Sequence, residues 1–238
     1  MAVDLLYSVD KDCVLCGKSF PVTKVRNRLR MLKQDSDFCT TYADINPYYY
    51  DIWVCPHCGY AAQESWFNEL GESAADKVKA FLKGKDVRVD FCGSRSRQQA
   101  LDTYRLAIFY GRLTGQVASR MAGLFLRMAW LFREAEEADK EQLALVEARK
   151  YYEEALMREP LPIGHMTEIS LEYIVAELYR RTGELDKALT GFGRIVGNPK
   201  AKLEKRLLEL ARDAWHETRD LRNGQKTEKT ENPDLLTP

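Results

Sequence analysis

The chain contains two matching cysteine motifs, Cys13-Val14-Leu15-Cys16-Gly17 and Cys55-Pro56-His57-Cys58-Gly59. In each motif, the C-x-x-C turn directs both sulfurs toward one point, and the glycine after the second cysteine permits the positive φ that the turn needs. Together the motifs supply four thiolates, which is the closed tetrahedral ligand set of structural zinc. The sequence therefore predicts one structural Zn²⁺ per chain, bound by Cys13, Cys16, Cys55 and Cys58.

The same motifs also resemble the iron site of rubredoxins, and aromatic residues are plentiful around the second motif: Tyr48, Tyr49, Tyr50, Trp53 and Tyr60. An iron site would make this part of the chain a rubredoxin-like electron carrier. We favour zinc over iron because the long helical remainder of the chain has no obvious use in electron transfer.

The segment between the two motifs is the next feature. Thirty-eight residues separate Cys16 from Cys55, more than the roughly 15–20 of a compact zinc ribbon, so we expect this segment to form strands of its own. As a strand, residues 24–30 would place Lys24, Arg26, Arg28 and Arg30 on one face. Such a stripe could bind phosphate or nucleic acid. A solvated strand face, or an edge protected by charge, is the interpretation that we favour.

Composition restricts the classes of protein to which the chain can belong. Its 238 residues include 36 basic and 36 acidic side chains, and 45% of the residues are hydrophobic. A chain of this composition can build a core and has no general attraction to nucleic acid or to an anionic membrane. It contains no apolar run of about 18 residues and no signal-peptide pattern at its start. We therefore expect a cytoplasmic protein without a membrane partner.

The second part of the chain repeats a pattern typical of the second helix of a tetratricopeptide repeat. A small, an aromatic and an apolar residue recur at i, i+4 and i+7, which lie on one helix face. The three copies are Ala100-Tyr104-Ala107, Ala148-Tyr152-Ala155 and Ala188-Phe192-Ile195. Their separations of 48 and 40 residues exceed the usual period of about 34, so the copies contain insertions. An irregular helical bundle is the alternative.

These patterns predict an α+β protein. Residues 1–92 form a small zinc-knuckle β module with two linking helices, at residues 60–70 and 73–83. Residues 93–221 form a mostly α, tetratricopeptide-like helical domain. The polar tail, residues 222–238, has almost nothing to bury, and we expect it to be disordered.

No catalytic constellation occurs in the sequence: Walker, His-Glu-x-x-His and nucleophile-elbow motifs are all missing or have the wrong spacing. Four thiolates on one zinc ion would leave no open coordination position for water. The prediction is a non-catalytic, zinc-stabilised binding or scaffold protein whose helical surface binds a protein or peptide. A nucleic-acid-associated zinc protein and an electron carrier are the alternatives.

The partner is expected on the first helix of each stacked pair, because these helices line the concave face of such arrays. The first helices are predicted at residues 119–137 and 168–181. Their polar stripe includes Arg120, Arg127, Glu134, Glu177 and Arg180. Arginines with interspersed glutamates suit an acidic or mixed-charge peptide. Alternatively, these charges pair with one another on a solvated surface and bind nothing.

Three stretches carry a resemblance to a known family. They are Cys13-x-x-Cys16-Gly-x-x-Phe20, Asn46-Pro47-x-Tyr49-Tyr50-x-x-Trp53-x-Cys55-Pro-His-Cys58-Gly59-Tyr60-Ala61, and Arg127-x-Ala129-Trp130-Leu131-x-Arg133. In these stretches the chain resembles a bacterial domain family of unknown function, number 2225. The resemblance covers nearly the whole chain except the tail. It implies a bacterial cytosolic protein with metal-ligand cysteines at Cys13, Cys16, Cys55 and Cys58, and it implies no activity.

Overall fold

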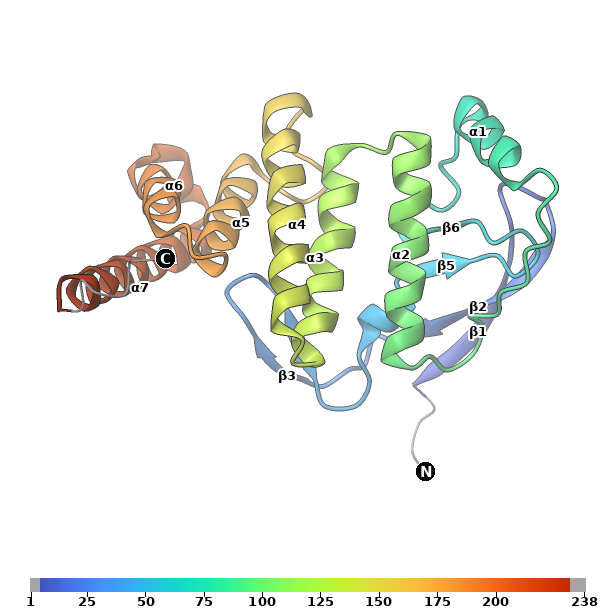
Figure 1. Ribbon diagram of the computed structural model, residues 1–238, viewed down its shortest axis with the longest axis horizontal. Coiled ribbons are helices and arrows are strands. Elements are labelled where there is room, and N and C mark those ends of the chain that lie inside the picture. Colours follow the sequence, from blue (N-terminus) through green and yellow to red (C-terminus); the bar gives the residue numbers. More distant parts are fainter. Residues whose placement is uncertain (1–4, 232–238) are drawn as a thin grey trace. The chain divides into compact units, whose positions relative to one another are not determined.

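The computed structural model describes residues 5–231, and the side chains of residues 5–225. The chain divides into two compact units, Met1–Ala144 and Leu145–Pro238. The first unit contains three β-hairpins and several helices, and the second contains helices (Figure 1). The predicted α+β class is therefore confirmed.

Each β-hairpin of the first unit forms a two-stranded antiparallel sheet of its own. Strand β1 (Leu6–Asp12) pairs with β2 (Ser19–Val25), and the first cysteine motif is the turn between them. Strand β5 (Ile52–Val54) pairs with β6 (Ala61–Gln63) around the second motif. Between them, β3 (Met31–Gln34) pairs with β4 (Thr40–Tyr42). The segment between the motifs thus forms strands, as predicted.

Two predicted elements of this unit are wrong. The segment 60–70 is no helix: it contains β6 and a short 3₁₀ turn, η2 (Glu64–Trp66), because the chain leaves the second cysteine turn antiparallel to β5. The basic segment 24–30 is no single strand, since β2 ends at Val25. The second linking helix is observed as α1 (Glu72–Leu82). Another 3₁₀ turn, η1 (Pro47–Tyr50), precedes β5.

Helices α2 (Arg97–Thr114) and α3 (Ala118–Glu134) belong to the same unit as the hairpins. A capping box formed by Ser96 and Gln99 starts α2, and Gly115, at φ 70°, ends it. The fully buried Tyr104 of α2 donates its hydroxyl to the carbonyl of Tyr48, at 3.0 Å. Strands β5 and β6 contact α2, and the compact unit to which they belong extends to Ala144. The domain boundary that the sequence predicts after residue 92 stays a prediction.

Helix α4 (Ala138–Arg158) crosses the division between the units. The second unit continues with α5 (Glu168–Arg181), α6 (Leu185–Gly197), a 3₁₀ turn η3 (Pro199–Leu203) and α7 (Lys205–Glu231). All residues of the three repeated patterns lie in α2, α4 and α6 and are buried. The pattern therefore marks core-facing helix positions, and tetratricopeptide-like stacking stays a prediction.

Helix α7 reaches into the tail that was expected to be disordered. Residues 222–231 belong to this helix, and residues 232–238 lie outside the described residues. Over the described part of the chain, none of the helices has the length and apolar character needed to cross a membrane.

Candidate metal centre

Backbone hydrogen bonds close each cysteine motif into a tight turn. The N–H of Gly17 donates to the carbonyl of Cys13, and the N–H of Gly59 donates to the carbonyl of Cys55, both at 2.8 Å. The two glycines have φ values of 70° and 74°, in the left-handed region that glycine adopts without strain. The predicted role of each glycine is therefore confirmed.

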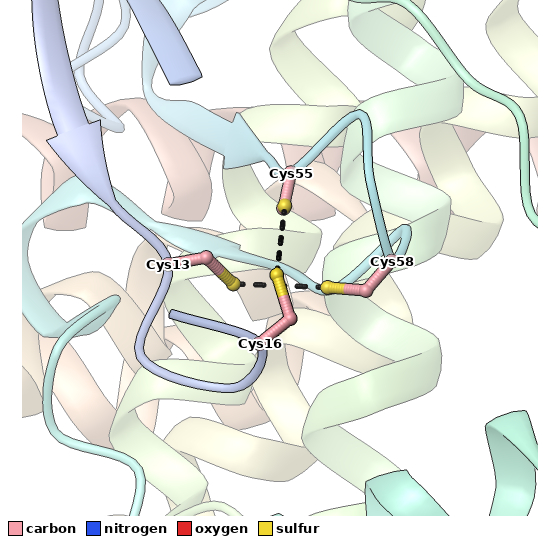
Figure 2. Close-up of side chains that lie close together, drawn as sticks. All are labelled: Cys13, Cys16, Cys55 and Cys58. Carbon is pink, nitrogen blue, oxygen red and sulfur yellow. Dashed lines mark hydrogen bonds between the residues drawn. The ribbon is translucent and has the colours of Figure 1, made fainter. Parts of the chain in front are cut away.

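The two turns bring all four sulfur atoms together (Figure 2). The four Sγ atoms lie within 4.8 Å of one another. The separations Cys13 Sγ–Cys58 Sγ and Cys16 Sγ–Cys55 Sγ are both 3.7 Å, and each joins one motif to the other. Cys13 and Cys55 are buried, Cys58 is partly buried and Cys16 is exposed. Among the residues that the structure describes, these four cysteines form a possible metal site.

Two of the sulfur separations match those around a tetrahedral ion. A Zn–S bond of about 2.3 Å in a regular tetrahedron places neighbouring sulfurs roughly 3.8 Å apart. The observed 3.7 Å agrees with that edge and is far longer than the roughly 2.05 Å of a disulfide. An ion held here would connect the β1–β2 hairpin to the β5–β6 hairpin.

The thiols of the cluster perturb one another. A hydrogen bond from Cys58 lowers the pKa of Cys13 to about 5, and the same bond raises the pKa of Cys58 far above its ordinary value. Burial raises the pKa of Cys55 to about 11. Four neighbouring thiols therefore resist ionising together. A divalent cation removes this conflict because it binds the thiolate form of each ligand.

The remaining cysteines and His57 lie outside the cluster. Cys39 is buried, and the Cys92 thiol donates to the carbonyl of Pro21 at 3.1 Å. His57 is exposed, and its Nε2 lies 3.2 Å from the carbonyl oxygen of Ser19. These positions agree with the assignment of only four cysteines as ligands.

Sequence reasoning missed Arg95, which supports the strand that leads into Cys55. Arg95 is 7% exposed. Its guanidinium donates to the carbonyls of Phe91, Tyr49 and Ile52 at 2.8, 3.0 and 2.8 Å. Arg95 lies in an irregular segment, where no repeating sequence pattern marks the buried positions. The neighbouring sequence therefore could not have identified its role.

Sequence reasoning also missed a buried ionic cluster around Asp37, which is fully buried in the turn between β3 and β4. Arg133 of α3 donates to Asp37 at 2.6 Å and to Asp35 at 3.1 Å. Trp130 donates to Asp37 at 3.1 Å. The cluster joins the β3–β4 turn to α3. A signal was present, since Trp130 and Arg133 belong to one of the motifs that carry the family resemblance.

Three predicted partner-binding residues, Arg120, Arg127 and Glu134, lie on α3 and bond to other segments of the first unit. Their partners are Glu69 for Arg120, Asp51 at 2.9 Å for Arg127, and Asn46 with Tyr49, both at 3.0 Å, for Glu134. These bonds connect α3 to the β-hairpin region and to the segment after it. A role of the three residues in binding a partner stays a prediction.

The other two predicted residues, Glu177 and Arg180, lie on α5. Glu177 is fully buried, and it accepts hydrogen bonds from Arg180 at 2.7 Å and from Arg181 at 2.8 Å. Two arginines therefore neutralise this buried carboxylate, and Arg180 is one of its counter-ions. A role of Glu177 and Arg180 in binding a partner stays a prediction.

The predicted phosphate-binding residues do not share one strand face. Lys24 lies on β2 and forms an ion pair with Glu64 at 2.5 Å. Arg26, Arg28 and Arg30 follow in the segment between β2 and β3, and all three are exposed. The continuous cationic strand face predicted from alternation is therefore wrong, because β2 ends before the arginines begin.

The two motif glycines offer a matched test of the local geometry. Alanine in the left-handed region costs about 1–2 kcal/mol at either position. A Cβ at Gly59 would also lie 2.5 Å from Cγ1 of Val87, whereas a Cβ at Gly17 meets nothing within 4 Å. Gly59→Ala is therefore expected to lower the melting temperature more than Gly17→Ala. Equal shifts in thermal unfolding of the metal-loaded variants would contradict this packing.

Fold and site together define a class: an α+β protein in which two cysteine-bearing hairpins form a candidate four-cysteine metal centre and helices make up the rest. Within that class, the chain belongs to the family described as uncharacterized protein conserved in bacteria (DUF2225), whose model matches residues 6–218. The resemblance seen in the sequence motifs is thus confirmed over both units. No curated protein and no solved structure matches the chain.

Proposed function

We propose that this protein is a non-catalytic, cytoplasmic binding protein, stabilised by zinc, whose helices hold a peptide segment of a partner protein. The observation that carries the proposal is the four-cysteine cluster, with sulfur separations that fit thiolates around one zinc ion. Four thiolate ligands fill a tetrahedral ion and leave no position for water or substrate. This ligand set supports a structural role for the metal.

The two cysteine-bearing hairpins need such a cross-link for their stability. The β1–β2 and β5–β6 hairpins form separate two-stranded sheets, and an isolated hairpin is marginally stable at best in water. Each hairpin contributes two of the four cysteines. Zinc bound between them would fix the hairpins to each other and so stabilise the surface on which α2 and α3 pack.

A groove on the second unit supplies a surface for a partner. It has a volume of about 890 Å³ and is formed by α4, α5 and α6. This volume lies within the roughly 300–1,000 Å³ typical of ligand sites. On α5 it is lined by Val175 and Tyr179, one stripe away from the predicted Glu177 and Arg180. Its apolar wall consists of Leu156, Met157 and Leu161.

The charged groups of the groove suit the backbone of an extended peptide. Glu172 of α5 lines the groove, and its buried Oε2 has no hydrogen-bond partner among the described residues. Arg194 of α6 lines the groove as well and is exposed. A carboxylate accepts from a peptide N–H and a guanidinium donates to a peptide carbonyl. The apolar wall would contact the side chains of the same segment.

Met157→Asp is expected to weaken peptide binding at least 10-fold. Met157 is 77% exposed, so the substitution adds a charge to the apolar wall while leaving the fold intact. Peptides selected from a random 12-residue display library on metal-loaded protein provide the ligands, and fluorescence polarisation measures their dissociation constants.

Leu203→Asp is the matched control, because Leu203 is 88% exposed in the same unit and does not line the groove. Its dissociation constants should equal those of the unmodified protein. Failure to enrich any peptide, or equal weakening by both substitutions, would contradict the proposed binding site.

A further inference from the structure

A second surface, independent of the groove, lies on the first unit. Residues 24–34, which we call the basic edge, contain five basic residues and no acidic one in a chain of zero net charge. Lys24 is paired with Glu64, and Lys33 with Asp35 at 2.7 Å. Arg28 and Arg30 are exposed, and neither side chain has a partner among residues 5–225. The basic edge therefore presents uncompensated positive charge.

The same segment exposes apolar side chains. Met31 and Leu32 are 61% and 60% exposed. Met31 pairs with Tyr42 and Lys33 pairs with Thr41, and the register of the β3–β4 pair shifts between them, at Leu32. All four residues of β3 are exposed, which means that neither face of this strand is covered. Among the described strands, β3 pairs with β4 alone. An exposed edge strand with apolar residues readily pairs with another chain.

The basic edge is also anchored. Asp35 and Asp37, in the turn after β3, are bound by Arg133 of α3, and the N–H of Asp35 donates to the carbonyl of Cys39 at 2.8 Å. These bonds hold the end of the β3–β4 hairpin against α3. A strand fixed in this way loses little conformational freedom when a partner binds to it.

We propose that the basic edge binds an acidic, extended peptide segment, which adds to β3 as a further antiparallel or parallel strand. The backbone of the segment would pair with β3, its carboxylates would lie beside Arg28 and Arg30, and its apolar side chains would contact Met31 and Leu32. A second copy of this chain is a poor occupant, because β3 pairing with β3 brings like charges together. Nucleic acid is also disfavoured, because the exposed apolar residues of β3 are not the aromatic rings on which bases stack.

The test uses the metal-loaded full chain and a fluorescein-labelled probe peptide, acetyl-(Glu-Val)₅-amide. Fluorescence anisotropy should show binding that weakens as salt is added. The double substitution Arg28→Glu with Arg30→Glu should raise the dissociation constant at least 10-fold, and Met31→Ser with Leu32→Ser should raise it at least 3-fold. All four residues are exposed, so metal content and melting temperature should stay unchanged.

Two controls separate strand addition from simple charge attraction. Arg88→Glu with Arg105→Glu alters two exposed arginines elsewhere in the unit and should leave the dissociation constant unchanged. A probe that is N-methylated at alternate residues keeps its side chains but cannot pair as a strand, and it should not bind. Equal binding of the N-methylated probe, or equal weakening by the control substitutions, would overturn the proposal.

The same experiment can also show that the basic edge binds something other than an acidic peptide. Tighter binding of a 30-nucleotide oligothymidine than of the probe would assign the surface to nucleic acid. Tighter binding of vesicles that contain phosphatidylserine would assign it to membranes. Self-association that the Arg28→Glu and Arg30→Glu substitutions remove, seen by sedimentation, would assign it to a second copy. Each of these results would overturn the acidic-peptide proposal, and none of them bears on the groove of the second unit.

Discussion

Cys55→Ser is expected to unfold at least the N-terminal hairpins of the protein. Cys55 is fully buried, and its Sγ lies 3.7 Å from that of Cys16, across the two motifs. Structural zinc contributes on the order of 10–16 kcal/mol in small peptides, which equals or exceeds the roughly 5–15 kcal/mol of net stability of most domains. Loss of one thiolate removes much of that free energy and leaves the other three sulfurs without their ion.

Metal analysis and circular dichroism measure the result. The unmodified protein should contain one zinc per chain, and Cys55→Ser should contain close to none and show a loss of ordered near-ultraviolet signal. Cys92→Ser is the control, because Cys92 lies outside the cluster and donates to the carbonyl of Pro21. Its zinc content should be unchanged. Zinc close to zero in the unmodified protein, or iron with its visible absorption, would contradict the zinc assignment.

The four-cysteine cluster was predictable because the sequence information that defines it is local. Two cysteines at C-x-x-C spacing and a following glycine are sufficient to define each turn, and a closed tetrahedron requires both turns. The repeated apolar pattern was predictable for the same reason, since i, i+4 and i+7 positions share a helix face whatever the helix packs against. Ala100, Ala148 and Ala188 are accordingly all fully buried.

The predicted elements were wrong where pairing with distant segments determines the local secondary structure. The alternation of residues 24–30 suggests a strand. However, β1 and β2 are antiparallel, and Val25 pairs with Leu6, the first residue of β1, so β2 has no partner strand beyond Val25. The segment 60–70 has residues suited to a helix. Instead it begins with β6, because β5 offers an open edge directly across the second cysteine turn.

The orientation of α5 could not be predicted from its sequence for a related reason. Helix periodicity identifies which residues share a face, but not which of two polar stripes meets solvent. On α5 the stripe with Glu177 turned inward, where Arg180 and Arg181 neutralise it, and the stripe with Val175 and Tyr179 lines the groove. Only the packing of α4 and α6 around α5 distinguishes the two stripes.

Arg133→Met is expected to cost about 3–5 kcal/mol of the free energy of unfolding, because it leaves a buried carboxylate without its counter-ion. Asp37 is 0% exposed and accepts hydrogen bonds from Arg133 at 2.6 Å and from Trp130 at 3.1 Å. For a unit of this size, such a loss lowers the melting temperature by on the order of 10 °C. Thermal and urea unfolding of the metal-loaded protein measure the change.

Two further variants show whether the unpaired charge causes the loss. Asp37→Asn combined with Arg133→Met removes the charge and keeps an acceptor for Trp130, so it should recover part of the stability that Arg133→Met loses. Arg105→Met removes an arginine whose ion pair with Asp102 is exposed, and it should cost less than about 1 kcal/mol. If the double variant is no more stable than Arg133→Met, the loss comes from the other contacts of Arg133, which are its bonds to Asp35 and Glu141 and its aliphatic packing, rather than from the unpaired charge of Asp37. If Arg133→Met costs no more than Arg105→Met, the buried cluster does not hold the turn at all, and the anchored basic edge that depends on it loses its physical basis.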